Sequence, residues 1–151
     1  MQDAYEPLRE RLRTLVQEAG YILVEAKFFQ KKASVRAYII IYSDSGIGTD
    51  DCGAIYWKTQ PALLEWFHCD EEHLYVEVSS PGLERVFKSQ EEYAIFKGKI
   101  IKIIKNDGLV VIGKLLGADA TQVMVQTGNE ELKLQFDAIA KTSLFSDYNE
   151  K

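Results

Sequence analysis

The chain has 151 residues, of which 46% are apolar and 27% are charged, and its formal net charge is −5. This composition is that of one or two small folded domains and excludes extensive disorder. No apolar run approaches the roughly eighteen residues of a membrane span, and the charged N-terminal stretch is unlike a secretory signal. The two cysteines favour a reducing cytoplasm over a disulfide framework.

The acidity of the chain restricts how it could contact RNA. Residues 1–88 hold ten basic and fourteen acidic side chains, and the remaining residues hold eight and nine. Neither half is basic, although neutralisation of phosphates supplies much of the affinity of RNA-binding domains. Any contact with RNA must therefore be local, or secondary to a contact with protein.

The first half of the chain predicts a helix, two strands, a second helix and a third strand. Residues 3–19 carry one apolar stripe at helical spacing. Residues 21–29 and 35–42 are rich in β-forming residues, and residues 30–34 join them as in a hairpin. A second helix begins at Thr49 or Asp50, and Pro61 is expected to kink or break it. Residues 74–79 alternate as a strand, which predicts a three-stranded sheet with two helices on one face.

The other face of this sheet is left open by the helices. Arg36 and Tyr38 of the second strand and Tyr75 and Glu77 of the third fall on it by alternation. Aromatic side chains beside a cation suit a binding surface, and the same face could equally meet a second domain.

The most basic cluster of the chain surrounds the tip of the predicted hairpin. It consists of Lys27, Lys31, Lys32 and Arg36. The cluster fits an ordinary solvated turn as well as a contact with nucleic acid. These four residues are the candidates for any contact with RNA.

The second half of the chain predicts a short helix and five short strands. The helix spans residues 89–96, and the strands span residues 99–105, 108–117, 121–127, 130–136 and 141–145, with a 3₁₀ turn before the last. Short strands separated by tight Gly, Asn and Asp turns are typical of a small closed barrel. We therefore predict an α+β protein of two domains, residues 1–87 and 88–151, with fraying after Asp147.

A stiff corner follows the third strand of the first domain. It reads Ser79, Ser80, Pro81, Gly82, Leu83, Glu84 and Arg85. Pro81 fixes its own φ, and Gly82 permits a positive φ. The corner could hold a phosphate or a peptide carbonyl, or could equally be a turn that links two domains.

The sequence predicts no catalytic, cofactor or metal site. Ser79 and Ser80 lack both a nucleophile elbow and an identifiable base. The spacing of the cysteines and histidines matches no common zinc pattern. We therefore expect a protein that is not an enzyme, with a hydrolase that uses one of the two serines as a lesser alternative.

The corner carries a resemblance to a known family. The run Val78 to Arg85 resembles the signature of the RimP family of bacterial ribosome maturation factors. Residues 20–24, 49–52, 96–99, 113–117 and 139–141 resemble further segments of that family in the same order. The chain departs from the pattern at Val86, where the family usually has a proline, and at Pro61 within the second helix.

The resemblance implies an N-terminal α/β domain joined to an SH3-like (Sm-like) barrel. The implied role is maturation of the small ribosomal subunit in the cytoplasm, without enzymatic activity or a cofactor. Such a protein binds the free or immature subunit and assists the folding of small-subunit rRNA and the incorporation of a basic ribosomal protein of the decoding region. We expect a monomer without membrane contact. The alternative is a general Sm-like or KH-like RNA-binding regulatory module.

Overall fold

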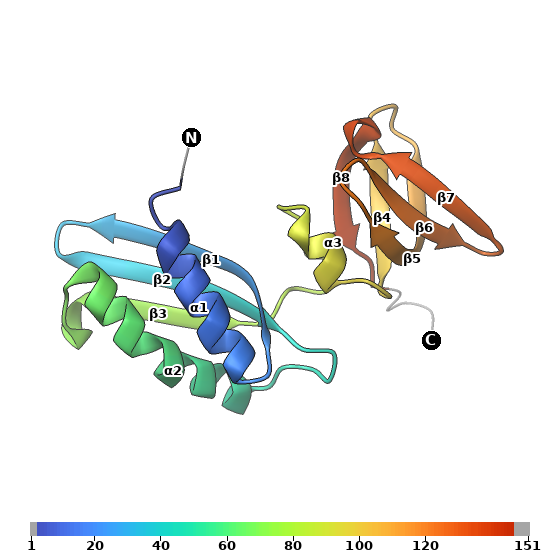
Figure 1. Cartoon of the computed structure of the whole chain (residues 1–151). Coiled ribbons are helices and arrows are strands. Elements are labelled where there is room, and N and C mark those ends of the chain that lie inside the picture. Colours follow the sequence, from blue (N-terminus) through green and yellow to red (C-terminus); the bar gives the residue numbers. More distant parts are fainter. Residues whose placement is uncertain (1–2, 147–151) are drawn as a thin grey trace. The chain divides into compact units, whose positions relative to one another are not determined.

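The computed structural model describes residues 3–146, so the fraying expected after Asp147 lies outside the described residues. The chain divides into two compact units, residues 1–81 and residues 82–151, and each has its own sheet (Figure 1). The class is α+β, as the sequence predicted. Within residues 3–146, no helix is both long and apolar enough to cross a membrane.

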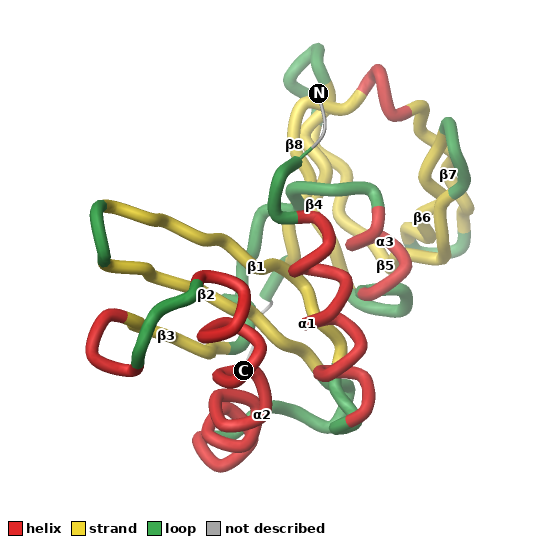
Figure 2. The backbone as a smooth tube through the Cα atoms, turned by 60° about the vertical axis from the view of Figure 1, so that its left-hand side comes forward, coloured by secondary structure: helices red, strands yellow, loops and turns green. Residues whose placement is uncertain are grey.

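The first unit is a three-stranded sheet with two helices on one face, and this prediction is confirmed. Its elements are α1 (Glu6–Glu18), β1 (Ile22–Lys31), β2 (Ser34–Tyr42), α2 (Thr49–Phe67), the 3₁₀ turn η1 (Glu71–His73) and β3 (Leu74–Ser79). β1 and β2 form an antiparallel hairpin. α2 carries the chain back along the sheet, so β3 joins β2 in parallel (Figure 2).

The core of the first unit lies between the helices and one face of the sheet. The apolar stripe of α1 places Leu8, Leu12 and Val16 in full burial, opposite Ala37 and Ile39 of β2. Each fully buried leucine contributes about 1.5–3 kcal/mol relative to an exposed one. Because side chains alternate along a strand, the neighbours of Ala37 and Ile39 point to the opposite, open face.

α2 runs unbroken through Pro61, which excludes the break that the sequence suggested. A proline in a helix interior costs about 3 kcal/mol through a lost hydrogen bond and a clash. Ala62 and Leu63 beside it are buried in the core, and this packing offsets the cost. The hydroxyl of Thr59 donates to the carbonyl of Ile55 (2.8 Å) in the preceding turn.

The second unit contains a short helix and five antiparallel strands. They are α3 (Glu91–Ile95), β4 (Ile100–Lys105), β5 (Val110–Ala118), β6 (Gln122–Thr127), β7 (Glu130–Gln135), the 3₁₀ turn η2 (Phe136–Ala138) and β8 (Ile139–Leu144). The strand order is β7-β6-β5-β4-β8, so all five predicted strands are confirmed. Within the described residues the sheet is not closed, and the barrel stays a prediction.

The interior of the second unit is formed by alternate apolar residues of its strands. Five of them are fully buried: Ile101, Ile103, Leu115, Val123 and Val125. Two register shifts, near Lys105 in β4 and near Gly117 in β5, bend the ladders at these positions. The alternation thus gives this sheet one packed face.

Candidate functional site

The corner that ends β3 is largely exposed. Ser80, Gly82, Leu83 and Glu84 are exposed, whereas Ser79 and Pro81 are half-buried. Gly82 does not adopt the positive φ that the sequence suggested, and no described atom lies within 4 Å of the position of an added Cβ. The N–H of Arg85 donates to the carbonyl of Gly82 (3.2 Å) and closes a turn. Residues 80–84 therefore present an exposed surface.

The side chain of Arg85 points away from that surface into the second unit. Its Nε and Nη2 donate to the two carboxylate oxygens of Glu92 on α3, at 2.8 and 2.9 Å. Only 6% of the Arg85 side chain and 2% of the Glu92 side chain are exposed. The N–H of Lys88 donates to the same carboxylate (3.0 Å). This paired arrangement anchors Arg85 to α3 within the second unit.

The segment after the corner also joins the second unit through its backbone. The N–H of Phe87 donates to the carbonyl of Thr142 on β8 (2.8 Å), and Val86 forms a bridge with Ser143. Val86 thus makes an edge contact with β8. Residues 85–87 are held by backbone and side-chain bonds together.

The hairpin tip is tighter than the sequence predicted. β1 and β2 extend to Lys31 and Ser34, which leaves the two-residue turn Lys32-Ala33. Lys32 adopts a left-handed conformation with φ 56°. All four of these residues are exposed. The turn projects its lysines into solvent at the end of the sheet.

Lys27, Lys31 and Arg36 share the open face of the first sheet. β1 and β2 pair so that Lys27 faces Tyr38 and Lys31 faces Ser34. The Nζ of Lys27 lies 3.9 Å from a carboxylate oxygen of Glu25. The structure therefore brings three of the four predicted basic residues onto one face, and Lys32 stands at its end.

Phe29 belongs to the same face and is the residue that the sequence reasoning missed. It lies opposite Arg36 in the β1–β2 register, between Lys27 and Lys31 along β1. More than half of its side chain is exposed. The alternation of Lys27, Phe29 and Lys31 along the strand is the signal that could have placed it there.

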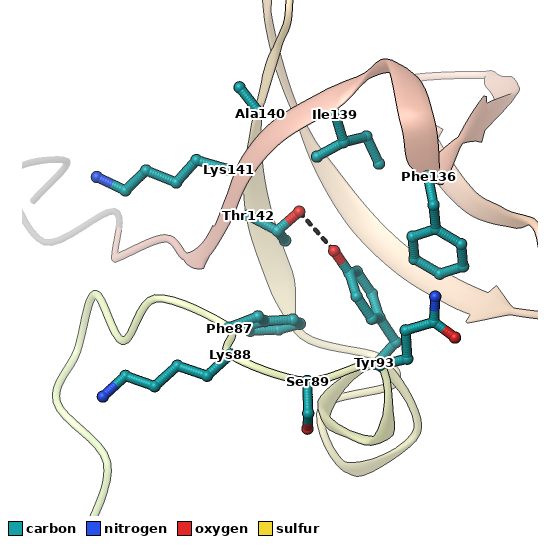
Figure 3. A pocket seen from close by; sticks show the side chains of 10 residues that line it. Phe87, Lys88, Ser89, Tyr93, Phe136, Ile139, Ala140, Lys141 and Thr142 are labelled. Atoms are coloured by element: carbon teal, nitrogen blue, oxygen red, sulfur yellow. Dashed lines mark hydrogen bonds between the residues drawn. The ribbon is translucent and has the colours of Figure 1, made fainter. Parts of the chain in front are cut away.

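The second unit contains a pocket of about 300 Å³ beside α3 and β8 (Figure 3). The ring of Tyr93 lies between those of Phe87 and Phe136, with centroid distances of 4.9 and 5.3 Å. The hydroxyl of Tyr93 donates to Oγ1 of Thr142 (2.6 Å), and burial raises the pKa of Tyr93. The rings of Phe87, Tyr93 and Phe136 thus form an aromatic wall of the pocket, and the hydroxyls of Tyr93 and Thr142 are engaged with each other.

The other side chains that could take part in a reaction lie outside this pocket. Cys52 and Cys69 are free thiols, and burial raises the pKa of both, which makes them poor nucleophiles. His73 pairs with Asp70 through Nδ1 (2.6 Å), and this hydrogen bond raises the pKa of His73. In the part of the chain that the structure describes, no three His, Cys, Asp or Glu side chains are grouped to hold a metal ion.

Comparison with known proteins shows what this chain is similar to. Residues 11–84 match the family model described as the RimP N-terminal domain. The ribosome maturation factor RimP of Borrelia hermsii (strain HS1 / DAH) is 26% identical over 136 residues, an alignment that covers 88% of this chain and 90% of that protein. The protein of the same name from Borrelia turicatae (strain 91E135) is 24% identical over 133 residues, with the same coverage. The alignments extend over both units, and these matches together support the RimP family for this chain.

Proposed function

We propose that this protein is a non-enzymatic factor for maturation of the small ribosomal subunit, acting in the cytoplasm. The observation that carries the proposal is the similarity to ribosome maturation factors along 88% of this chain and 90% of each relative. In this role it binds the free or immature subunit and assists the folding of rRNA and the incorporation of a ribosomal protein. It acts as a monomer and needs no cofactor.

The charge of the chain supports docking of a basic ribosomal protein. The net charge is −5, and an acidic surface attracts a strongly basic partner while it disfavours indiscriminate binding to RNA. We place this contact on the second domain and on residues 80–84 of the corner, because of the exposed surface of the corner rather than the net charge of the domain, since residues 89–151 hold nine acidic and eight basic side chains. Leu83 of the corner is 65% exposed and is followed by the exposed carboxylate of Glu84. An apolar side chain beside an acid suits a basic partner of the decoding region.

We place a local contact with small-subunit rRNA on the first domain. Lys27, Lys31, Lys32 and Arg36 are exposed and gather on the β1–β2 hairpin. Four cations within one hairpin can neutralise phosphates even on an acidic chain, because the interaction depends on local rather than net charge. We infer that this hairpin approaches the rRNA backbone.

The second domain is proposed to be an SH3-like barrel spanning residues 88–151. Three features support this: five short antiparallel strands, register shifts that bend two of the ladders, and a 3₁₀ turn that joins the edge strands β7 and β8. In a closed barrel, amide protons of β7 and β8 exchange as slowly as those of β4. Rapid exchange along both edge strands would show an open sheet.

The alternative function is an Sm-like or KH-like RNA-binding module that acts outside the ribosome. The exposed aromatic and basic face of the first unit is the observation that favours it. The two functions predict different results in a strain that lacks this gene. The maturation factor predicts accumulation of unprocessed small-subunit rRNA and a shortage of mature small subunits, both restored by the wild-type chain. Normal rRNA processing in that strain refutes the maturation role.

A further inference from the structure

Three aromatic side chains, one from each strand, form a bent row on the open face of the first sheet. The row consists of Phe29 on β1, Tyr38 on β2 and Tyr75 on β3. The ring centroids of Phe29 and Tyr38 lie 5.8 Å apart, and those of Tyr38 and Tyr75 lie 6.1 Å apart. The row follows from the register, which pairs Arg36 with both Phe29 and Tyr75 and so sets Tyr38 diagonally between the two rings.

The two outer rings of the row are exposed and Tyr38 between them is half-buried, although the unit has a core in which such rings could be buried. Phe29 is 54% exposed and Tyr75 is 50% exposed. Phe28, the neighbour of Phe29, points to the other face and is buried in the core. The chain therefore places one phenylalanine in the core and leaves the next on the surface. An exposed aromatic row of this kind indicates a binding surface.

Cations line the row on both sides. The guanidinium of Arg36 lies 5.7 Å from the centre of the Tyr75 ring, and its Nη1 donates to the hydroxyl of Tyr38 (3.5 Å). Alternation places Lys27 and Lys31 on the same face, on either side of Phe29 along β1. The face thus combines rings with positive charge, which is the combination that holds single-stranded nucleic acid.

The two carboxylates on this face have partners of their own. Glu77 accepts a hydrogen bond from the hydroxyl of Tyr75 (3.0 Å). Glu25 is largely covered, with 15% of its side chain exposed, and lies 3.9 Å from the Nζ of Lys27. The repulsion of an incoming phosphate by Glu25 is therefore partly offset by Lys27, whereas Glu77 keeps its negative charge and is outnumbered by the exposed cations Lys31 and Arg36.

We propose that this face binds an unpaired segment of RNA, with bases stacked on Phe29 and Tyr75 and phosphates beside Lys31 and Arg36. The inference rests on the proposed role in ribosome maturation and adds the form of RNA that is recognised. Ring spacings near 6 Å exceed the roughly 3.4 Å between bases stacked in a helix, so each ring receives a base that has left its stack. The rings are tilted by 72° and 60°, which likewise favours separate bases over one continuous stack.

The geometry also predicts which RNA is rejected. Bases within a duplex have no free face to offer a ring, so paired RNA can use only the cations of this face. Stacking on an aromatic ring tolerates any base, so the surface selects for lack of pairing rather than for sequence. The expected ligand is a loop or a single-stranded junction that has not yet folded.

The test is fluorescence anisotropy of the purified full-length chain with a labelled single-stranded RNA of about ten nucleotides of mixed sequence. Phe29→Leu and Tyr75→Leu keep an apolar side chain on a strand and remove the ring. Each is expected to weaken binding about tenfold or more, because stacking of one base on one ring contributes that much. Tyr75→Trp keeps a ring and should retain the affinity of the wild type.

Trp57→Leu is the matched control, because Trp57 is 67% exposed but lies on α2, in the helical layer. It should bind the RNA as the wild type does. A hairpin duplex of the same composition should bind more weakly than the single strand. Far-UV circular dichroism and thermal melting of each variant exclude misfolding as the cause of any loss.

Equal affinity of Phe29→Leu, Tyr75→Leu and the wild type would overturn the inference. Binding of the duplex as tight as that of the single strand would also overturn it. So would variants that still bind the RNA but no longer bind a ribosomal protein. These results leave the proposed maturation role intact, because that role is measured by rRNA processing in the deletion strain. Conversely, ring-dependent binding supports the inference even if rRNA processing in that strain is normal.

Discussion

Replacing Glu92 by glutamine should destabilise the second unit, because the buried guanidinium of Arg85 then loses the negative charge of Glu92. The two side chains are only 6% and 2% exposed, and two hydrogen bonds of 2.8 and 2.9 Å join them. Removing one partner of a buried ion pair costs about 3–5 kcal/mol. Glutamine keeps an oxygen that can still accept from the N–H of Lys88, so the lower end, about 3 kcal/mol, is expected.

That loss is large for a unit of this size. For a domain of this length, each kcal/mol shifts the melting temperature by about 4–8 °C, so a fall of roughly 12–24 °C is expected. The double variant Arg85→Met with Glu92→Leu should recover most of the stability, because it removes both buried charges and fills the space. Recovery in the double variant distinguishes the loss of the Arg85–Glu92 charge pairing from a simple packing defect.

Urea unfolding followed by two probes makes the test specific. Both tryptophans, Trp57 and Trp66, lie in α2, so tryptophan fluorescence reports the first unit, whereas far-UV circular dichroism reports both. Glu92→Gln should lower the urea midpoint of the second unit and leave the tryptophan midpoint unchanged. Glu65→Gln, which breaks an exposed pair with Arg11 (2.6 Å), should change stability by less than about 1 kcal/mol. A Glu92→Gln variant as stable as the wild type would refute the reasoning.

Two further predictions concern stability. Gly113→Ala should destabilise the second unit by about 1–3 kcal/mol, because the added Cβ would lie 2.4 Å from the backbone oxygen of Gln126. Gly53→Ala should stabilise the first unit by roughly 0.5–1 kcal/mol, because Gly53 lies in the interior of α2 with nothing near the position of an added Cβ. Urea midpoints that move in the same direction for both variants would contradict this prediction. The hydrogen bond between Asp70 and His73 raises the pKa of His73 and lowers that of Asp70. Its stabilisation is therefore full between the ordinary values of 3.8 and 6.5, and is lost as pH rises through the raised pKa of His73 or falls through the lowered pKa of Asp70. His73→Gln should accordingly lower the melting temperature more near pH 5.5 than near pH 9, and a difference that grows toward high pH would refute this sign.

Local patterns in the sequence were sufficient to predict the order of the secondary-structure elements. The alternation in residues 35–42 and 74–79 identified β2 and β3, and the Gly, Asn and Asp turns separated the five strands of the second unit. Of the kink or break predicted at Pro61, the break was wrong because helix propensity is a local quantity, whereas burial of Ala62 and Leu63 is a tertiary one; the kink stays a prediction. Tertiary packing decided that position.

The candidate site was only partly accessible to sequence reasoning. Lys27, Lys31 and Arg36 could be grouped because they are close along one hairpin. The role of Phe29 needed the register between β1 and β2, and the pairing of Arg85 with Glu92 needed the position of α3. Both depend on contacts between elements, which no local pattern in a single sequence specifies. The hydrogen bonds therefore assign Arg85 a structural contact that its exposed neighbours do not share.

The central claim, that this protein acts on the small ribosomal subunit, is tested most directly by sedimentation with purified subunits. The full-length chain is mixed separately with small and large subunits at low salt, where charge-dependent contacts are strongest, and each mixture is run on a sucrose gradient. The account predicts that the protein migrates with the small subunit, does not migrate with the large subunit, and leaves the small-subunit peak as salt is raised. A protein that stays at the top of both gradients, or that follows the two subunits equally, would contradict it.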